Sequence, residues 1–288
     1  MTDVVVPTPS PQPPTTPAGR LQSRIALVTG SSTGIGRAIA LAYAAAGARV
    51  LCADLRANVD PARSSEVPAL GTAEEIVARG GEAVFVECDV TVGEQVRGAV
   101  GRAVEFWGRL DIMVNNAGVS LESLAPGPIY EASEDVWDKT MAINLRGVFL
   151  GCKHASAQMM KQEPLASGDR GWIINVASVM GLVAMKSSPA YVASKSAVVG
   201  LTRSVGIDLA PYRIHANCIA PSYTQTPLLS MATALISPAE MEGLHALHPF
   251  KGLGQPEDIA KVAVFFGSDD CSWVTSATLA VDGGFTAM

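Results

Sequence analysis

Apolar and polar positions alternate along this chain in a repeating series of short and long segments. From residue 24 onward, short runs that are almost wholly apolar, such as RIALVTG, ARVLCAD and WIINVAS, alternate with longer segments whose apolar residues recur at helical spacing. Strands that are apolar on both faces are typical of a parallel sheet covered by helices on both sides. The pattern predicts one doubly wound α/β domain over residues 23–288, with about seven parallel strands and right-handed crossovers.

The first 22 residues do not follow this pattern. Residues 1–20 contain six prolines and few large side chains, a composition typical of a disordered, partly polyproline-like segment. They also lack the basic start and the apolar centre of a secretory signal. We therefore expect a disordered tail over residues 1–22 and a domain that starts at residue 23.

Composition argues against several classes of function. Of the 288 residues, 48% are apolar and 17% are charged, and the net charge of −6 comes without any basic run, which argues against a nucleic-acid partner. No apolar stretch approaches the length of a transmembrane helix, so we expect no membrane partner. Five widely spaced cysteines without a CxxC pair indicate reduced thiols in a cytoplasmic protein. Four histidines without an HExxH motif argue against a metal site.

A glycine-rich turn joins the first predicted strand to the first predicted helix. The residues from Thr29 to Gly36 read TGSSTGIG, which has the spacing GxxxGxG. The glycines permit a tight turn, and the start of the helix offers free N–H groups to a pyrophosphate. The same segment also matches the hydrolase elbow GxSxG at 30–34, with Ser32 as nucleophile and one of the histidines as base. That alternative fits less well, because such an elbow follows a strand deep in the sheet, whereas this turn follows the first strand of the chain.

Asp54 ends the second predicted strand, 18 residues after Gly36. An acidic side chain there can accept hydrogen bonds from both ribose hydroxyls of an adenosine, and it would repel a 2′-phosphate. Thr33, which stands just before the second glycine of the turn, is not basic. Both features favour NAD over NADP, although Arg37 and Arg56 are nearby cations that could weaken the preference.

Tyr191 and Lys195 are four residues apart in YVASKSAVVGLTRSVGIDLA, a segment whose apolar residues have helical spacing. On one helix the two side chains share a face, and an ammonium near a phenol lowers the pKa of the phenol. A tyrosine tuned in this way can act as an acid or a base near neutral pH. The plainer interpretation is a half-buried helix with one aromatic side chain and one surface lysine. The other motifs are needed to decide between these two interpretations.

Those motifs follow one another in a fixed order over nearly the whole chain after residue 24. They are TGSSTGIG at 29–36, Asp54, CDV at 88–90, NNAG at 115–118, Asn144, Ser178, YVASK at 191–195, PSYTQT at 221–226, GQPEDIA at 254–260 and VDGG at 281–284. In this order and spacing the chain resembles the classical short-chain dehydrogenases/reductases. The resemblance implies a single-domain Rossmann fold and an oxidoreductase that uses NAD or, less well supported by Asp54, NADP.

The resemblance also implies roles for individual positions. Asn144, Ser178, Tyr191 and Lys195 would form a catalytic tetrad. Tyr191 would exchange a proton with the substrate oxygen, Ser178 would polarise that oxygen, and Lys195 would bind the nicotinamide ribose. Asn144, on a helix that we expect over residues 133–161, would hold a water leading to Lys195. Cofactor contacts would come from Gly30, Ser32, Gly34, Ile35, Gly36, Asp54, Asp89, Val90, Asn116, Ala117, Gly118, Tyr191, Lys195, Pro221, Thr224 and Thr226.

Residues 222–250 are expected to form a flap over the substrate. They are rich in apolar side chains, which favours an apolar or cyclic secondary alcohol or ketone; a flap that fills its own core is the alternative. Ser222 stands where the family usually has glycine. Because serine tolerates positive φ poorly, we expect the turn on the nicotinamide side to differ from the family pattern.

The predicted function is therefore the NAD(H)-dependent interconversion of a small secondary alcohol and a ketone. The resemblance implies a homotetramer or homodimer, with the Tyr191 helix, the 133–161 helix and the C-terminal strand at the interfaces. A non-catalytic, dinucleotide-binding regulatory protein of the same fold is the alternative from another class, and the intact tetrad argues against it. A hydrolase built on Ser32 would leave the other motifs unexplained.

Overall fold

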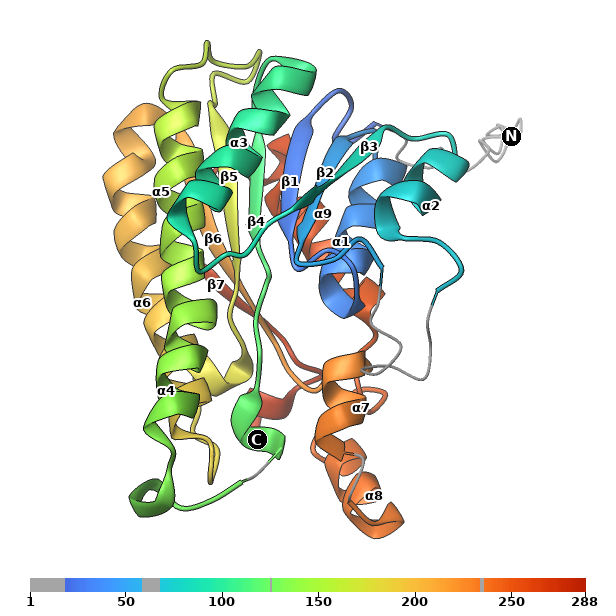
Figure 1. Cartoon of the computed structure of the whole chain (residues 1–288), viewed down its shortest axis with the longest axis vertical. Coiled ribbons are helices and arrows are strands. Elements are labelled where there is room, and N and C mark those ends of the chain that lie inside the picture. The colour runs from blue at the N-terminus through green and yellow to red at the C-terminus, as the bar shows by residue number, and fades with distance from the viewer. Residues whose placement is uncertain (1–18, 59–67, 125, 234–235) are drawn as a thin grey trace, which may run out of the picture.

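The computed structural model describes residues 19–58, 68–124, 126–233 and 236–288. Seven parallel strands form one sheet in the order β3-β2-β1-β4-β5-β6-β7 (Figure 1). The sheet order reverses between β1 and β4, as in a doubly wound Rossmann fold. The strands are β1 (Ile25–Thr29), β2 (Arg49–Asp54), β3 (Ala83–Glu87), β4 (Ile112–Asn115), β5 (Gly171–Val176), β6 (Ile214–Pro221) and β7 (Thr278–Val281).

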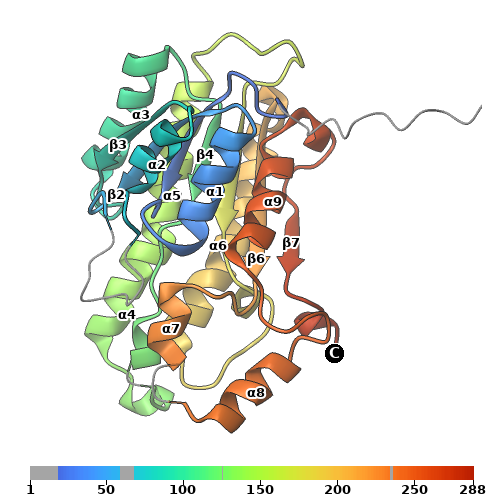
Figure 2. The same ribbon diagram turned by 90° about the vertical axis from the view of Figure 1, so that its right-hand side faces the viewer.

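Helices cover both faces of this sheet, and a smaller helical part lies at its carboxyl edge. The helices are α1 (Gly34–Ala45), α2 (Thr72–Ala78), α3 (Gly93–Trp107), α4 (Glu134–Met141), α5 (Gly147–Met159), α6 (Pro189–Leu209), α7 (Pro227–Thr233), α8 (Pro238–Ala246) and α9 (Pro256–Phe266). Figure 2 shows α7 and α8 beyond the carboxyl ends of the strands. The expected flap over 222–250 therefore corresponds, in its described residues, to α7, α8 and the turns beside them.

Each face of the sheet has its own hydrophobic core. In β1, Ala26 and Val28 pack into the core shared with α1 and α9, whereas Ile25 and Leu27 pack into the core shared with α3, α5 and α6. Successive side chains of a strand point to opposite faces, so a strand between two helical layers must be apolar throughout. This is the physical reason for the uninterrupted apolar runs in the sequence.

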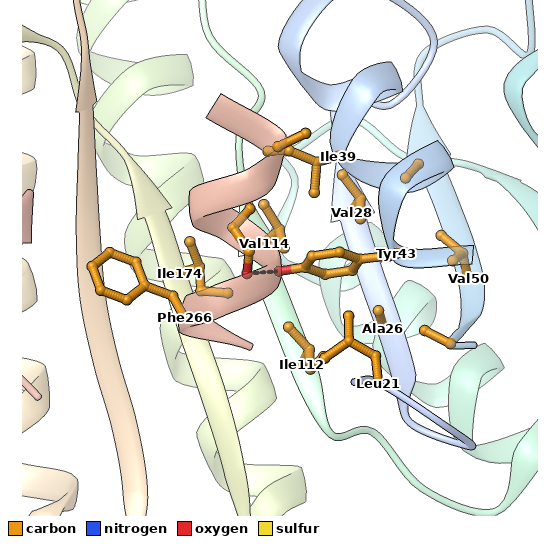
Figure 3. Packing of buried hydrophobic residues seen from close by; sticks show 14 of the residues in the cluster. Leu21, Ala26, Val28, Ile39, Tyr43, Val50, Ile112, Val114, Ile174 and Phe266 are labelled. Atoms are coloured by element: carbon orange, nitrogen blue, oxygen red, sulfur yellow. Dashed lines mark hydrogen bonds between the residues drawn. The ribbon is translucent and has the colours of Figure 1, made fainter. Parts of the chain in front are cut away.

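Tyr43 shows how a polar group is accommodated in the first of these cores. Its ring is fully buried, and its hydroxyl donates to the carbonyl of Ala263 on α9 at 2.9 Å (Figure 3). Burial raises the pKa of the Tyr43 phenol. A neutral, hydrogen-bonded hydroxyl carries no unsatisfied donor into the core, and the bond ties α1 to α9.

Residues 19–22, at the end of the predicted tail, belong to the folded domain. Leu21 is fully buried in the core with α1 and α9. Its backbone N–H donates to Ala46 O at 3.0 Å, and Ser23 N donates to Gly47 O at 3.0 Å. The predicted tail over 1–22 is thus wrong for its last residues. The remainder of that prediction, over residues 1–18, lies outside the described residues.

A chain of buried amides crosses the sheet next to the carboxyl edge. Asn115 on β4 donates to Asn175 Oδ1 on β5 at 2.9 Å, and Asn175 donates to Thr202 Oγ1 on α6 at 2.9 Å. All three side chains are buried. A Cβ on Gly151 of α5 would lie 1.8 Å from Asn115 Oδ1, so this glycine leaves space for the amide. This series of hydrogen bonds fixes β5, which Ser178 follows, and α6, which contains Tyr191.

The helix expected over residues 133–161 is interrupted at its centre. Between α4 and α5 the structure has a π-helical turn over Ala142–Arg146, and this turn contains Asn144. Single π-turns within α-helices occur frequently at functional sites. The expected helix is therefore present over most of its length, with an irregularity at the predicted catalytic residue.

The five cysteines are free and buried. In the described parts of the chain, no helix is long and apolar enough to cross a membrane. Within the same residues, no group of three or more His, Cys, Asp and Glu side chains is arranged to hold a metal ion.

Candidate active site

The turn between β1 and α1 has no space for side chains at its glycines. Gly30 has a φ of +63°, and a Cβ there would lie 2.8 Å from Ala117 Cα. A Cβ on Gly36 would lie 2.0 Å from Gly30 O. At the start of α1, Thr33 makes no side-chain cap and the first turn has no acidic residue. The N–H groups of this helix end are therefore left for an anion such as a pyrophosphate.

Asp54 lies at the end of β2, directly beside this turn. Its Oδ2 accepts from Ser32 N at 3.0 Å, and its Oδ1 accepts from Leu55 N at 2.7 Å. Arg37, which could have weakened a preference for NAD, instead forms an ion pair with Glu75. The carboxylate is only half-buried, and each of its oxygens has a further lone pair with which to accept a ribose hydroxyl.

The predicted residues after β3 and β4 border the same turn. Asn116 Nδ2 donates to Thr29 O at 3.0 Å and to Gly30 O at 3.1 Å, which steadies the glycine turn. Asp89 Oδ1 accepts from Thr91 N at 2.9 Å. Val90 packs against the start of α5, where a Cβ on Gly147 would lie 2.9 Å from Val90 Cγ2. Ala117 N donates to Thr29 Oγ1 at 3.2 Å, beside the turn that holds Ser32 and Gly34. Ile35 packs against the core shared by α1 and α9. Gly118 lies farther along, where a Cβ would be 3.3 Å from Asn144 Oδ1 and 3.4 Å from Lys195 Nζ.

Ser178, Tyr191 and Lys195 come together at the carboxyl end of β5. Ser178 follows this strand, and its Oγ accepts from Met180 N at 3.1 Å. Tyr191 is in the first turn of α6. Lys195, one turn later, is buried; its Nζ donates to Val176 O at 2.9 Å and lies 5.8 Å from the centroid of the Tyr191 ring. The sequence spacing of four residues thus places both side chains on the same face of α6.

The electrostatics of this group differ in part from the expectation. Burial lowers the pKa of Lys195 to about 8. Burial also raises the pKa of Tyr191, the hydrogen bond with the Ser178 side chain lowers it, and the nearby Tyr223 raises it. The expected lowering by Lys195 is not among the causes of the Tyr191 shift. The group that favours the phenolate of Tyr191 is Ser178.

Asn144, on the π-helical turn, is fully buried. Its Oδ1 accepts from Val119 N at 2.8 Å, and its Nδ2 donates to Val119 O at 2.9 Å and to Ser194 Oγ at 3.2 Å. The side-chain amide is thus bonded to protein groups on both sides. If Asn144 holds a water, we expect the backbone carbonyl rather than the side chain to do so.

The segment after β6 folds back toward the glycine turn. Thr224 is buried, and its Oγ1 donates to Ser222 O at 2.9 Å. A Cβ on Gly34 would lie 3.2 Å from Thr226 Cγ2, so the two ends of the predicted cofactor site are in contact. Pro221 is the last residue of β6.

Ser222 does not adopt the positive φ that would have strained it. Its N–H donates to Val281 O at 3.2 Å, which continues the pairing of β6 with β7. Its Oγ lies 2.8 Å from His248 Nε2. Serine is thus accommodated here without positive φ, and it gains a hydrogen bond that glycine cannot make.

Comparisons with known proteins point to one family. Residues 30–286 match the profile of a family described as enoyl-(acyl carrier protein) reductase. The chain is 36% identical to 3beta-hydroxysteroid dehydrogenase 2 of Eggerthella lenta over 93% of this chain and 96% of the relative. It is 36% identical to trans-4-hydroxycyclohexanecarboxylate dehydrogenase of Sinomonas cyclohexanicum over 93% of this chain and 95% of the relative. A crystal structure of a short-chain type dehydrogenase/reductase from Mycobacterium marinum superimposes with a TM-score of 0.80 at 31% identity, covering 93% of this chain and 97% of that one.

The chain belongs to the short-chain dehydrogenase/reductase family. It is an oxidoreductase, and the family uses NAD or NADP. The residues described above fit such a cofactor, because the glycine cradle, the uncapped start of α1 and Asp54 form a continuous edge. When bound, a nicotinamide carries the hydride.

Two residues of this short-chain dehydrogenase/reductase site could not be found from the sequence. Glu122, in a short 3-10 turn after β4, accepts from Ala190 N and Tyr191 N of α6. Tyr223 lies near Tyr191, and its hydroxyl donates to Met185 Sδ at 3.3 Å. Glu122 has no periodic spacing and stands in no motif, so only the fold brings it to the site. Tyr223 belongs to the PSYTQT segment and to the expected flap, but its place beside Tyr191 comes from the fold.

The geometry does not support Ser32 as a hydrolytic nucleophile. Ser32 Oγ donates to Arg56 O at 2.5 Å. His248 is bonded to Ser222 and to Leu244 O. Among the described hydrogen bonds of Ser32, none is to a histidine, so the base that a hydrolase requires is missing there.

Proposed function

We propose that this enzyme is an NAD(H)-dependent dehydrogenase that interconverts a secondary alcohol and a ketone, with Tyr191 as the general acid and base. The observation that carries the proposal is that Ser178, Tyr191 and Lys195 lie together at the carboxyl edge of the sheet, where the Ser178 side chain lowers the pKa of Tyr191 and Lys195 Nζ lies 5.8 Å from the centroid of the Tyr191 ring. A substrate oxygen placed between these hydroxyls can accept one proton from Tyr191 and one hydrogen bond from Ser178.

Lys195 supports the proposal as a residue that would hold the cofactor. Its pKa of about 8 keeps the ammonium protonated at neutral pH. One of its N–H groups donates to Val176 O, and the others would donate to the hydroxyls of the nicotinamide ribose. Asn144 fixes Ser194 and the segment after β4, and thereby the first turn of α6.

Asp54 supports NAD rather than NADP. The carboxylate lies beside the phosphate turn, where it would accept from ribose hydroxyls and repel a 2′-phosphate. The ion pair of Arg37 with Glu75 reduces the attraction of that cation for such a phosphate. Titration with NADH and NADPH, followed by nicotinamide fluorescence, tests this assignment. We expect tighter binding of NADH, and clearly tighter binding of NADPH would overturn it.

The rim of the site supports an apolar or cyclic substrate. Leu182 and Val183, before α6, and Leu228 and Met231, on α7, are large apolar side chains that remain exposed. Exposed apolar side chains near a catalytic group are typical of pockets that take apolar ligands. The relatives named for a hydroxysteroid and for a hydroxycyclohexanecarboxylate both act on ring compounds by their names.

The experiment is turnover of a panel of cyclic ketones with NADH, by wild type and by Tyr191→Phe. We expect wild-type turnover of cyclic ketones and loss of turnover in the variant, with NADH binding retained. Turnover unchanged in Tyr191→Phe would refute the role of the tyrosine. Binding of NADH without turnover of any substrate would favour the regulatory alternative. Turnover of strongly charged substrates alone would refute the apolar site.

We also propose that copies of this chain associate through the outer face of α4 and α5. An open apolar hollow of about 610 Å³ lies there, lined by Asp138, Met141, Ala142, Leu145, Arg146, Phe149 and Leu201. Phe149 is 47% exposed, which is unusual for so large an apolar ring outside an interface. Sedimentation analysis of Phe149→Glu tests the proposal; a change from oligomer to smaller species is expected, and a monomeric wild type would refute it.

A further inference from the structure

The segment that follows β4 contacts the first turn of α6 through a buried carboxylate. Glu122 is only 8% exposed. One of its oxygens accepts from Ala190 N at 3.0 Å, and the other accepts from Tyr191 N at 2.8 Å. The first N–H groups of a helix have no partner within the helix, and Ser188 at the N-cap position of α6 makes no side-chain cap bond. Glu122 therefore supplies the cap from 68 residues away in the sequence.

The same segment also holds the carbonyl side of Tyr191. Tyr191 O accepts from Ser194 Oγ at 2.8 Å, and Ser194 Oγ accepts from Asn144 Nδ2 at 3.2 Å. Asn144 in turn exchanges two hydrogen bonds with the backbone of Val119. The N–H and the carbonyl of Tyr191 are thus both tied, directly or through two side chains, to residues 119–122.

We propose that Glu122 is a positioning residue that holds the Tyr191 phenol in reach of Ser178 and the substrate oxygen. The proposal rests on the function proposed above, which gives Tyr191 its part in proton transfer. Both carboxylate oxygens already accept backbone N–H groups, so Glu122 acts through the placement of Tyr191 and not on the substrate. An interaction at the backbone of the reacting residue matters for rate, because a displacement of about 1 Å costs about a hundredfold in catalysis.

The test is the Glu122→Gln variant. Glutamine has the same shape, but its amide group places an N–H donor against a backbone N–H, so one of the two bonds is lost. We expect kcat for cyclic ketone reduction to fall by about tenfold or more, with KM for NADH and for the ketone within about twofold of wild type. Loss of positioning alone affects the chemical step more than ground-state binding.

Asp258→Asn is the matched control. Asp258 is the carboxylate that caps α9, where its Oδ2 accepts from Gln255 N at 3.0 Å. The substitution makes the same chemical change at a helix start outside the candidate site. We expect kcat of Asp258→Asn to remain at the wild-type value. A kcat of Glu122→Gln within twofold of wild type, or no lower than that of Asp258→Asn, would overturn the positioning role.

A second measurement separates this proposal from the proposed function. The Tyr191 phenol can be titrated by NMR with tyrosine labelled at the ring carbon that carries the hydroxyl, and assigned with Tyr191→Phe. Tyr191 has Lys195, Ser178 and Tyr223 near it. If Glu122→Gln draws the phenol away from Ser178, the pKa of Tyr191 rises, because the Ser178 side chain, which lowers that pKa, acts on it less. Removal of a negative charge alone would lower that pKa.

A raised pKa of Tyr191 in Glu122→Gln therefore supports the proposal, and an unchanged or lowered pKa refutes it. If wild-type protein turns over no ketone, the proposed function fails and this titration alone decides on Glu122. If Glu122→Gln does not fold, Glu122→Asp, which keeps the carboxylate but shortens the side chain, is measured by the same two methods. Activity and a pKa of Tyr191 equal to wild type in Glu122→Asp, which cannot span the same distance, would overturn the proposal.

Discussion

Replacement of Lys195 by methionine is expected to abolish turnover and to make the protein more stable. Burial lowers the pKa of Lys195 from 10.5 to about 8, so the ammonium is less favourable in the folded chain than in the unfolded one. At about 1.4 kcal/mol per pKa unit, the shift corresponds to about 3 kcal/mol at neutral pH. Loss of the hydrogen bond to Val176 O offsets about 1 kcal/mol. Methionine, of similar length and without charge, should therefore raise the free energy of unfolding by about 2 kcal/mol at pH 7.

The difference in stability between Lys195→Met and wild type should change with pH in one direction. Below pH 8 Lys195 is protonated in both states, and the burial of its charge destabilises the wild type fully. Between pH 8 and 10.5 the unfolded chain binds more protons at this group than the folded chain, so wild-type stability rises with pH relative to the variant. The advantage of Lys195→Met is therefore lost progressively over this interval.

Urea unfolding of both proteins at several pH values from 7 to 10.5 measures the difference between their free energies of unfolding. The contributions of other titrating groups are the same in both proteins and cancel. Lys161→Met, which replaces an exposed lysine, is the control, and we expect it to show no such trend. A Lys195→Met protein less stable than wild type at pH 7 would refute the reasoning. A difference that stays constant up to pH 10.5 would refute it as well.

Three further outcomes follow from contacts in the structure. Gly36→Ala should weaken NADH binding strongly, because the new Cβ would lie 2.0 Å from Gly30 O; isothermal titration checks this. Asn175→Ala should destabilise the fold by about 2–5 kcal/mol in urea unfolding, since it removes the acceptor of buried Asn115 Nδ2 and the donor to buried Thr202 Oγ1. Ser222→Ala should raise KM for the ketone more than it lowers kcat, because the bond from Ser222 to His248 ties the flap to the end of β6; steady-state kinetics would show an unchanged KM if the bond has no such role.

Much of the fold could be predicted because its physical cause is visible in the sequence. A strand with helices on both faces is buried at every position and is therefore mostly apolar, and β1, β5 and β6 show this directly. The positions of Tyr191 and Lys195 also follow from sequence, since four residues make about one helical turn. The close approach of backbone at Gly30 and Gly36 is likewise implied by the need for glycine there.

Other features depend on contacts between distant segments, and the sequence carries no periodic signal for them. Leu21 is a single apolar residue next to a proline-rich segment, and its burial depends on α1 and α9. Glu122 stands in a short polar turn, and its partner N–H groups belong to α6. The low pKa of Lys195 arises from burial at the end of β5, which helical spacing alone does not reveal. The π-turn at Asn144 has the same apolar spacing as an ordinary helix.

That π-turn fixes the length of the chain between α4 and α5 to the single residue. An α-helix rotates by about 100° and advances by about 1.5 Å with each residue. Deletion of Ile143 would restore a regular helix, but it would turn the buried face of α5, with Val148 and Cys152, away from the sheet. An insertion would turn this face of α5 away from the sheet in the opposite direction. Most surface loops tolerate such length changes, whereas variation at this turn should be confined to substitutions.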